Sequence, residues 1–241
     1  MSWFESWFDS PYYHILYQHR DEAEAEYFLD SLLDFLHPEA HSSMLDLACG
    51  KGRHSVYLNE KGYAVTGIDL SEQSIEYCKQ FENKNLSFFV HDMRKLFRVN
   101  DFNYVFNLFT SFGYFDKETE NHAAMKNACM ALRKGGVLVI DFLNPTYVSK
   151  HLIASEMVEV AGIKFNIARK IKDGYFYKNI HFSDAARIYD FTEKVQALTL
   201  NEFEKYIIPN GMVIEHIFGD YHLNAFDRET SPRLILLAKK K

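Results

Sequence analysis

A glycine-rich segment around residue 50 carries the residue types best suited to holding a ligand. Residues 44–54 read MLDLACGKGRH, in which an apolar run leads into a small turn and then a helical pattern. Glycines let a ligand approach the backbone closely, and the first turn of a helix offers N–H groups without partners. The run also carries Asp46, whose carboxylate can accept hydrogen bonds. The segment therefore predicts a cofactor site, and the alternative is a plain strand-to-helix turn.

Two kinds of cofactor suit this segment. A dinucleotide would place its pyrophosphate on the helix N-terminus, but the third glycine of its G-x-G-x-x-G fingerprint is replaced here by Ser55. S-adenosylmethionine has no phosphate, and Asp46 can hold its amino-acid end through hydrogen bonds from backbone or water. The turn alone leaves both cofactors open.

Three further apolar runs end in residues that could contact the same ligand. Asp69 ends the next run, roughly 20 residues past the turn, where an acidic side chain can accept hydrogen bonds from ribose hydroxyls. Asp92 can accept from the exocyclic amine of adenine, and Met93 can pack on the ring. The backbone of Asn107 and Leu108 suits an adenosyl group, and the aromatic residues that follow could line a substrate site.

These residues need a scaffold, and the chain alternates strand-like runs with helical patterns from residue 43 to residue 141. We expect strands over 43–47, 63–69, 86–90, 104–109 and 137–141, and helices over 53–61, 72–83 and 117–132. Such alternation produces βαβ units, a parallel sheet and helices on both of its faces. Because ligands of these sheets bind outside the carboxyl ends of the strands, the candidate residues should meet at one edge.

The pattern changes after residue 141. A short helix is expected from Asn144-Pro145, antiparallel strands over 158–195 with a hairpin at 172–174, and a helix that begins at a Thr199–Glu202 capping box and ends near Pro209. Runs over 212–218 and 233–238 predict an antiparallel pair at the edge of the main sheet. The strands over 158–195 are interpreted as an insertion above the site.

Composition limits the partners. The 241 residues carry 27 Lys+Arg and 33 Asp+Glu, and the net charge of −6 disfavours a nucleic-acid partner. The three cysteines form no C-x-x-C pair and are expected to be reduced and buried. No apolar run approaches the ~20 residues of a membrane helix, and the N-terminus lacks a cationic leader, so we expect a cytoplasmic protein that binds no membrane.

Together the motifs resemble the class I S-adenosylmethionine-dependent methyltransferases, most of all a small-molecule branch with an N-terminal helical lid. The matching segments are LDLACGKGRH (45–54), GIDLS (67–71), HDMR (91–94), NLFTSFGYF (107–115) and LRKGGVLVIDF (132–142). None is specific alone, but five in order are, and the resemblance covers nearly the whole chain. Cys49 departs from the commoner Gly or Pro and stays within the range of the family.

The resemblance implies an α/β fold with a Rossmann-like, doubly wound sheet of seven strands, the last of them antiparallel. A β insertion follows the fifth strand. The whole chain, 1–241, would form one methyltransferase domain. It would consist of an N-terminal helical segment (1–40), a core (43–145 and 200–241) and the antiparallel insertion (155–198).

The resemblance also implies a set of cofactor contacts. Asp46, Ala48, Cys49, Gly50 and Gly52 would surround the methionine part, Asp69 and Leu70 the ribose, Asp92 and Met93 the adenine, and Asn107, Leu108 and Phe109 the transferable methyl. Relatives fold a Tyr-bearing segment over the cofactor, which makes Tyr17 and Arg20, together with Tyr13, candidates for a lid.

The implied reaction is methyl transfer from S-adenosyl-L-methionine to a small organic acceptor by in-line displacement, with S-adenosyl-L-homocysteine as product. The run NLFT after the fourth strand lacks the N-P-P-[YF] tetrapeptide of methylases that act on nucleic-acid and protein amino groups. No metal site is expected. A base would assist some acceptors, and the candidates, none of which we assign, are His91, Tyr114, His181, Tyr221 and His222.

Two alternatives remain open at this point. One is an NAD(P)-dependent oxidoreductase, against which Ser55 and Asp46 count. The other is a non-catalytic S-adenosylmethionine-binding protein, because methyl transfer requires no catalytic side chain that its loss would reveal. The chain is expected to be a monomer or a homodimer.

Overall fold

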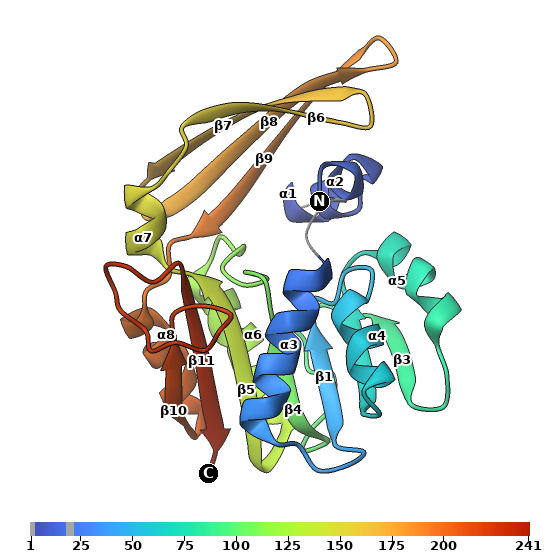
Figure 1. Ribbon diagram of the computed structural model, residues 1–241, viewed down its shortest axis with the longest axis vertical. Coiled ribbons are helices and arrows are strands. Elements are labelled where there is room, and N and C mark those ends of the chain that lie inside the picture. Colours follow the sequence, from blue (N-terminus) through green and yellow to red (C-terminus); the bar gives the residue numbers. More distant parts are fainter. Residues whose placement is uncertain (1–2, 18–21) are drawn as a thin grey trace.

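A seven-stranded sheet forms the centre of the molecule in the computed structural model, which describes residues 3–17 and 22–241 (Figure 1). Its order is β10-β11-β5-β4-β1-β2-β3. The strands are β1 (Ser43–Leu47), β2 (Ala64–Asp69), β3 (Leu86–Val90), β4 (Phe102–Asn107), β5 (Leu132–Leu143), β10 (Met212–Phe218) and β11 (Arg233–Lys240). Strands β1 to β5 pair in parallel, and β11 runs antiparallel to both of its neighbours. The expected α/β sheet with an antiparallel last strand is confirmed.

Helices cover both faces of this sheet, because side chains along each strand alternate between the faces. One face packs on α6 (Glu118–Ala131) and α8 (Leu200–Ile207) through residues such as Leu45 and Val105. The other packs on α3 (Glu22–Leu36), α4 (Arg53–Glu60) and α5 (Glu72–Cys78) through Met44 and Phe106. No helix in the described part of the chain is long and apolar enough to cross a membrane.

A second sheet follows α7 (Pro145–Lys150) and lies beyond the carboxyl ends of the parallel strands (Figure 1). It is an antiparallel meander of β6 (Ser155–Val160), β7 (Ile163–Lys172), β8 (Tyr175–Asp184) and β9 (Arg187–Gln196). The N-terminal helices α1 (Trp3–Phe8) and α2 (Pro11–Leu16) pack against one face of it, where Trp7, Phe165 and Phe182 are fully buried. Helices α1 and α2 and the β insertion therefore form one layer beyond the carboxyl ends of the parallel strands, whereas α3, the rest of the expected N-terminal helical segment, packs on a face of the main sheet.

Several local predictions are confirmed by side-chain caps. Asn144 accepts a hydrogen bond from the Thr146 N–H at the start of α7. Thr199 and Glu202 form the capping box of α8, in which the Thr199 N–H donates to the Glu202 carboxylate at 2.6 Å. These signals were readable because a cap involves residues only two or three positions apart.

Several strand boundaries and two turns differ from the prediction. Strand β4 ends at Asn107 rather than 109, because the backbone then turns left-handed, with φ of +55° at Phe109 and +63° at Thr110. Strand β5 begins five residues early, at Leu132. The Ala185–Ala186 turn was not predicted, because alanine at positive φ (47° and 62°) carries none of the glycine or asparagine signal of a hairpin. The β6–β7 turn at Ala161–Gly162 was also not predicted, although Gly162, with a φ of +78°, is a typical turn residue.

The ring of Phe88 fills the space beneath the glycine-rich turn. A Cβ added at Gly67 on β2 would lie 2.6 Å from Phe88 Cδ1 and 3.0 Å from Cys49 Sγ, and one added at Gly52 would lie 2.9 Å from the same ring. Both glycines are thus required by close packing, and Gly52 also by its φ of +79°.

Gly67→Ala should lower the free energy of unfolding by about 1–3 kcal/mol, because the added methyl group overpacks the Phe88 ring. Urea titration of Gly67→Ala, Phe88→Leu and the double variant measures the coupling between the two positions. Relief of the clash should make the double variant more stable than the sum of the single effects, by about 1 kcal/mol. Strictly additive effects would contradict this packing.

Candidate functional site

A cavity of about 590 Å³ lies at the carboxyl ends of β1, β2 and β4, beneath α1, α2 and β9. This volume is in the range of small-molecule sites. The residues of the predicted set that line it are Tyr17, Ala48, Cys49, Gly50, Asp69, Leu108 and Phe109. Of the four strands whose carboxyl ends were expected at the site, β1, β2 and β4 reach the cavity and β3 does not.

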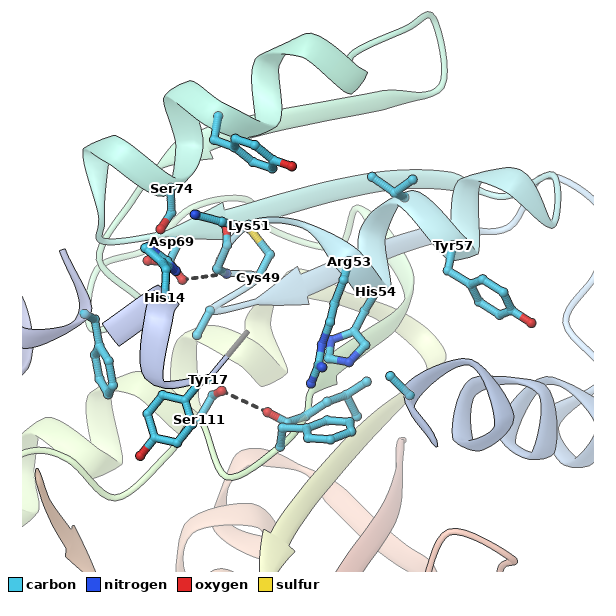
Figure 2. Close-up of a pocket in the computed structure, with 18 of the residues that line it drawn as sticks. His14, Tyr17, Cys49, Lys51, Arg53, His54, Tyr57, Asp69, Ser74 and Ser111 are labelled. Carbon is cyan, nitrogen blue, oxygen red and sulfur yellow. Dashed lines mark hydrogen bonds between the residues drawn. The ribbon is translucent and has the colours of Figure 1, made fainter. Parts of the chain in front are cut away.

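Asp69 is the carboxylate that organises the glycine-rich turn. Its Oδ2 accepts from the Gly50 N–H and its Oδ1 from the Ser71 N–H, both at 2.8 Å. Burial raises the pKa of Asp69, although the backbone hydrogen bonds oppose that effect. Each carboxylate oxygen has a second lone pair, so Asp69 can still accept from a bound hydroxyl. Figure 2 shows it on the cavity wall beside His14.

Asp46 lies behind the turn and does not line the cavity. It is 1 % exposed, and the Ser55 hydroxyl donates to its Oδ2 at 2.7 Å. Burial, more than the nearby Asp69, raises the pKa of Asp46 to about 6. Asp46 therefore joins the end of β1 to the first turn of α4. Ser55, which breaks the dinucleotide fingerprint, is the residue that makes this link.

The remaining predicted residues are described by the structure but do not line the cavity. Gly52 is the N-cap residue of α4. Leu70 and Met93 pack against the main core. The Asp92 carboxylate accepts hydrogen bonds from Arg94, at 3.0 Å from Nε to Oδ1 and at 2.8 Å from Nη2 to Oδ2. Burial alone would raise the pKa of Asp92, but Arg94 lowers it. Asn107 Nδ2 donates to the carbonyls of Leu47 and Ser111.

Arg20 lies outside the described residues. For every residue of the predicted set, whether or not it lines the cavity, the assignment to the cofactor stays a prediction.

Sequence reasoning missed several side chains that line the cavity, among them His14, Lys51, Arg53 and His54. Lys51, Arg53 and His54 lie within or next to the first turn of α4, so their position in the glycine-rich segment could have predicted them as site residues. The Phe109 ring stacks with the His54 ring at 5.1 Å and lies 4.4 Å from the Arg53 guanidinium. Figure 2 shows Arg53 and His54 side by side.

His14 had no signal in the sequence. Its Nε2 is buried and has no hydrogen-bond partner within the described part of the chain. Burial, and then the charge of Lys51, lower the pKa of His14 to about 4, so the ring is neutral at pH 7. A neutral ring nitrogen that faces a cavity can donate to or accept from a ligand.

Aromatic rings and one carboxylate form another part of the wall. Phe8, Tyr13, Tyr17 and Tyr114 line it together with Glu193 of β9. Both lid candidates that the structure describes, Tyr13 and Tyr17, therefore reach the cavity. Of the candidate bases only Tyr114 does so; His91, His181, Tyr221 and His222 do not.

The loop after β4 is held by Asp141, which is fully buried at the end of β5. The Phe109 N–H donates to its Oδ2 at 2.8 Å, and Arg233 Nε donates to its Oδ1 at 2.7 Å. Arg233 Nη2 also reaches the Thr110 hydroxyl at 3.0 Å. Burial raises the pKa of Tyr221, whose protonated hydroxyl donates to Asp141 at 3.3 Å.

Within residues 3–17 and 22–241, no group of three or more His, Cys, Asp or Glu side chains is arranged to hold a metal ion.

Comparisons of sequence agree with this geometry. A family model described as "Methyltransferase domain" matches residues 44–136. A putative methyltransferase of Bacillus subtilis (strain 168), YqeM, is 34 % identical over 101 residues, which are 41 % of each chain. The dTDP-3-amino-3,4,6-trideoxy-alpha-D-glucopyranose N,N-dimethyltransferase of Streptomyces venezuelae is 26 % identical over 76 % of this chain and 79 % of its own length.

Solved structures share the whole fold. An S-adenosylmethionine-dependent methyltransferase from Clostridium acetobutylicum ATCC 824 superposes with a TM-score of 0.79 at 18 % identity, over 95 % of this chain and 96 % of that one. The S-adenosylmethionine-bound amino pentose methyltransferase CalS10 of Micromonospora echinaspora gives 0.70 at 19 % identity, over 96 % and 98 %. The sheet order and these matches agree: the chain has the fold of the S-adenosylmethionine-dependent methyltransferases, and its residues 44–136 match the methyltransferase domain model.

Proposed function

We propose that the chain transfers the methyl group of S-adenosylmethionine to a small organic acceptor and works as one catalytic domain. The observation that carries the proposal is the shared cavity: Asp69 and Gly50 line it together with the aromatic side chains of α1, α2 and the loop after β4. Relatives named for amino-sugar substrates support a small acceptor. The net charge of −6 disfavours a nucleic acid as acceptor.

The chain's own residues bind and align. Asp69 accepts hydrogen bonds from the ribose hydroxyls, and the buried Nε2 of His14, which faces the same region, has a free site for a further one. The turn from Ala48 to Gly50 lets the amino-acid end approach the backbone, with Asp46 fixing the turn from behind.

Alignment supplies most of the catalysis in this proposal. The cofactor brings a methyl group already activated by its sulfonium, so the protein needs no nucleophile of its own. Holding acceptor and methyl in line can contribute roughly 7–11 kcal/mol in favourable cases. The helices α1 and α2 and β9 of the second sheet form one wall of the cavity.

Asp69→Ala should weaken binding of S-adenosylmethionine by about 10- to 100-fold, because hydrogen bonds to a charged group contribute about 1.5–3 kcal/mol. Isothermal titration calorimetry measures the affinity, with Asp173→Ala at the exposed β7–β8 turn as the control. Equal affinity of the Asp69 variant and the wild type would refute the ribose role. Release of S-adenosylhomocysteine with an acceptor distinguishes an enzyme from a protein that only binds the cofactor.

Asp46→Asn should change how stability depends on pH. Asp46 has a pKa of about 6 in the folded state, against 3.8 when unfolded. Below pH 4 the group is therefore neutral in the folded state and does not lower the free energy of unfolding. As the pH rises through 6 the buried charge lowers the free energy of unfolding by about 3 kcal/mol. Asparagine keeps an acceptor for Ser55 and carries no charge.

Relative to the wild type, the Asp46→Asn protein should therefore gain stability between pH 4 and pH 7. Urea titrations at intervals of half a pH unit give the difference. Asp173→Asn, at the exposed β7–β8 turn, should follow the wild-type profile. Parallel profiles for Asp46→Asn and the wild type would show that Asp46 is charged throughout.

A further inference from the structure

One carboxylate stands among the aromatic rings that line the cavity. Glu193 comes from β9, and the rings belong to Phe8, Tyr13, Tyr17 and Tyr114. The rings form a continuous row: centroids are 4.9 Å apart for Tyr13–Tyr17, 5.0 Å for Phe8–Tyr13 and 5.3 Å for Phe8–Tyr114. Tyr13 and Tyr17 of this row are also the lid candidates, whereas none of the proposed cofactor contacts uses Glu193, Phe8 or Tyr114.

Glu193 is fixed in place by two neutral donors. The Trp7 indole N–H donates to its Oε1 at 2.7 Å, and the Tyr17 hydroxyl donates to the same oxygen at 2.6 Å. An ionised carboxylate has about four acceptor sites, so these two hydrogen bonds hold the group without saturating it. The ammonium of Lys178 faces Glu193 across the β8–β9 ladder, donates to the Tyr17 hydroxyl and lies 4.4 Å from the centre of that ring.

This arrangement favours a cation. A positive group is attracted to the faces of aromatic rings and, more strongly, to a carboxylate that is partly withdrawn from water. A neutral hydroxyl can donate to Glu193 but gains little from the rings. Because the Lys178 ammonium already lies on the Tyr17 ring, a cationic ligand at Glu193 would face the rings of Phe8, Tyr13 and Tyr114. The preference is for a ligand that combines N–H donors with positive charge.

We propose that Glu193 is the acceptor-recognition residue and that the acceptor is a small organic amine. The inference rests on the proposed function, since it identifies the chemistry of the acceptor in the same cavity. Glu193 accepts an N–H hydrogen bond from the amine and so fixes the direction of the nitrogen lone pair. It is a specificity-determining residue.

The transfer balances without a further reactant. An amine that arrives protonated first releases one proton to water. Its lone pair then forms the new N–C bond, the C–S bond breaks, and the electron pair of that bond stays on sulfur. The positive charge passes from sulfur to nitrogen, and the product leaves as a substituted ammonium.

The test measures recognition apart from turnover. Protein saturated with S-adenosylhomocysteine is titrated calorimetrically with matched pairs: benzylamine and benzyl alcohol, cyclohexylamine and cyclohexanol, 2-aminoethylbenzene and 2-phenylethanol. Each amine should bind at least tenfold more tightly than its alcohol. The preference should fall to less than threefold in Glu193→Gln, which keeps an acceptor oxygen for Trp7 and Tyr17, and should persist in Glu193→Asp.

Asp190→Asn is the matched control, because Asp190 lies on the same strand with its side chain on the opposite face, exposed and 2.6 Å from His181. It should keep the wild-type preference. Equal binding of amines and alcohols by the wild type, or a preference that survives in Glu193→Gln, would overturn the inference. Failure of S-adenosylhomocysteine to bind the wild type would instead overturn the proposed function, so the two failures are distinguishable.

Discussion

The buried carboxylate of Asp141 is the constraint on which the shape of the site depends. A charge fully removed from water is tolerable only where ion pairing and hydrogen bonds replace its hydration, and loss of one partner typically costs about 3–5 kcal/mol. Its partners come from three separate places: Arg233 at the start of β11, the Phe109 N–H after β4, and Tyr221 before β11. The antiparallel last strand, β11, therefore supplies the positive charge of Arg233 that balances Asp141 near the end of β5.

That ion pair determines the conformation of a cavity wall. Two successive non-glycine residues at positive φ are unfavourable. The backbone keeps them because the Phe109 N–H donates to the Asp141 carboxylate and the Thr110 N–H donates to the backbone carbonyl of Asp141. The Phe109 ring is thereby presented to His54 and Arg53 in the first turn of α4. A pair in the sheet thus aligns a loop with the helix that follows the glycine-rich turn.

The contrast between local and distant contacts explains what could be predicted from the sequence. The glycine-rich turn, the caps at Asn144 and Thr199 and the alternation of strands and helices along the chain rest on neighbouring residues and on periodicity, and they were predicted. The order of the strands within the sheet was not predicted, because it depends on pairing between residues far apart in the sequence. The early end of β4 depends on Asp141, a residue 32 positions away, and was not. Glu193 was missed for the same reason, since its partner Trp7 lies 186 positions away. His14 reaches the cavity only because α2 packs beneath the second sheet.

The N-terminal helices connect the start of α5, beside Asp69, to Glu193 in the second sheet. Asp9, between α1 and α2, accepts from the Ser71 hydroxyl at 2.7 Å, next to Asp69 at the start of α5. Trp7, two residues earlier, donates to Glu193 in the second sheet. A shift of these helices must therefore act on the start of α5, beside Asp69, and on Glu193 together. The turn around Gly50 is built from local contacts, whereas the row of rings brings together residues that are far apart in the sequence.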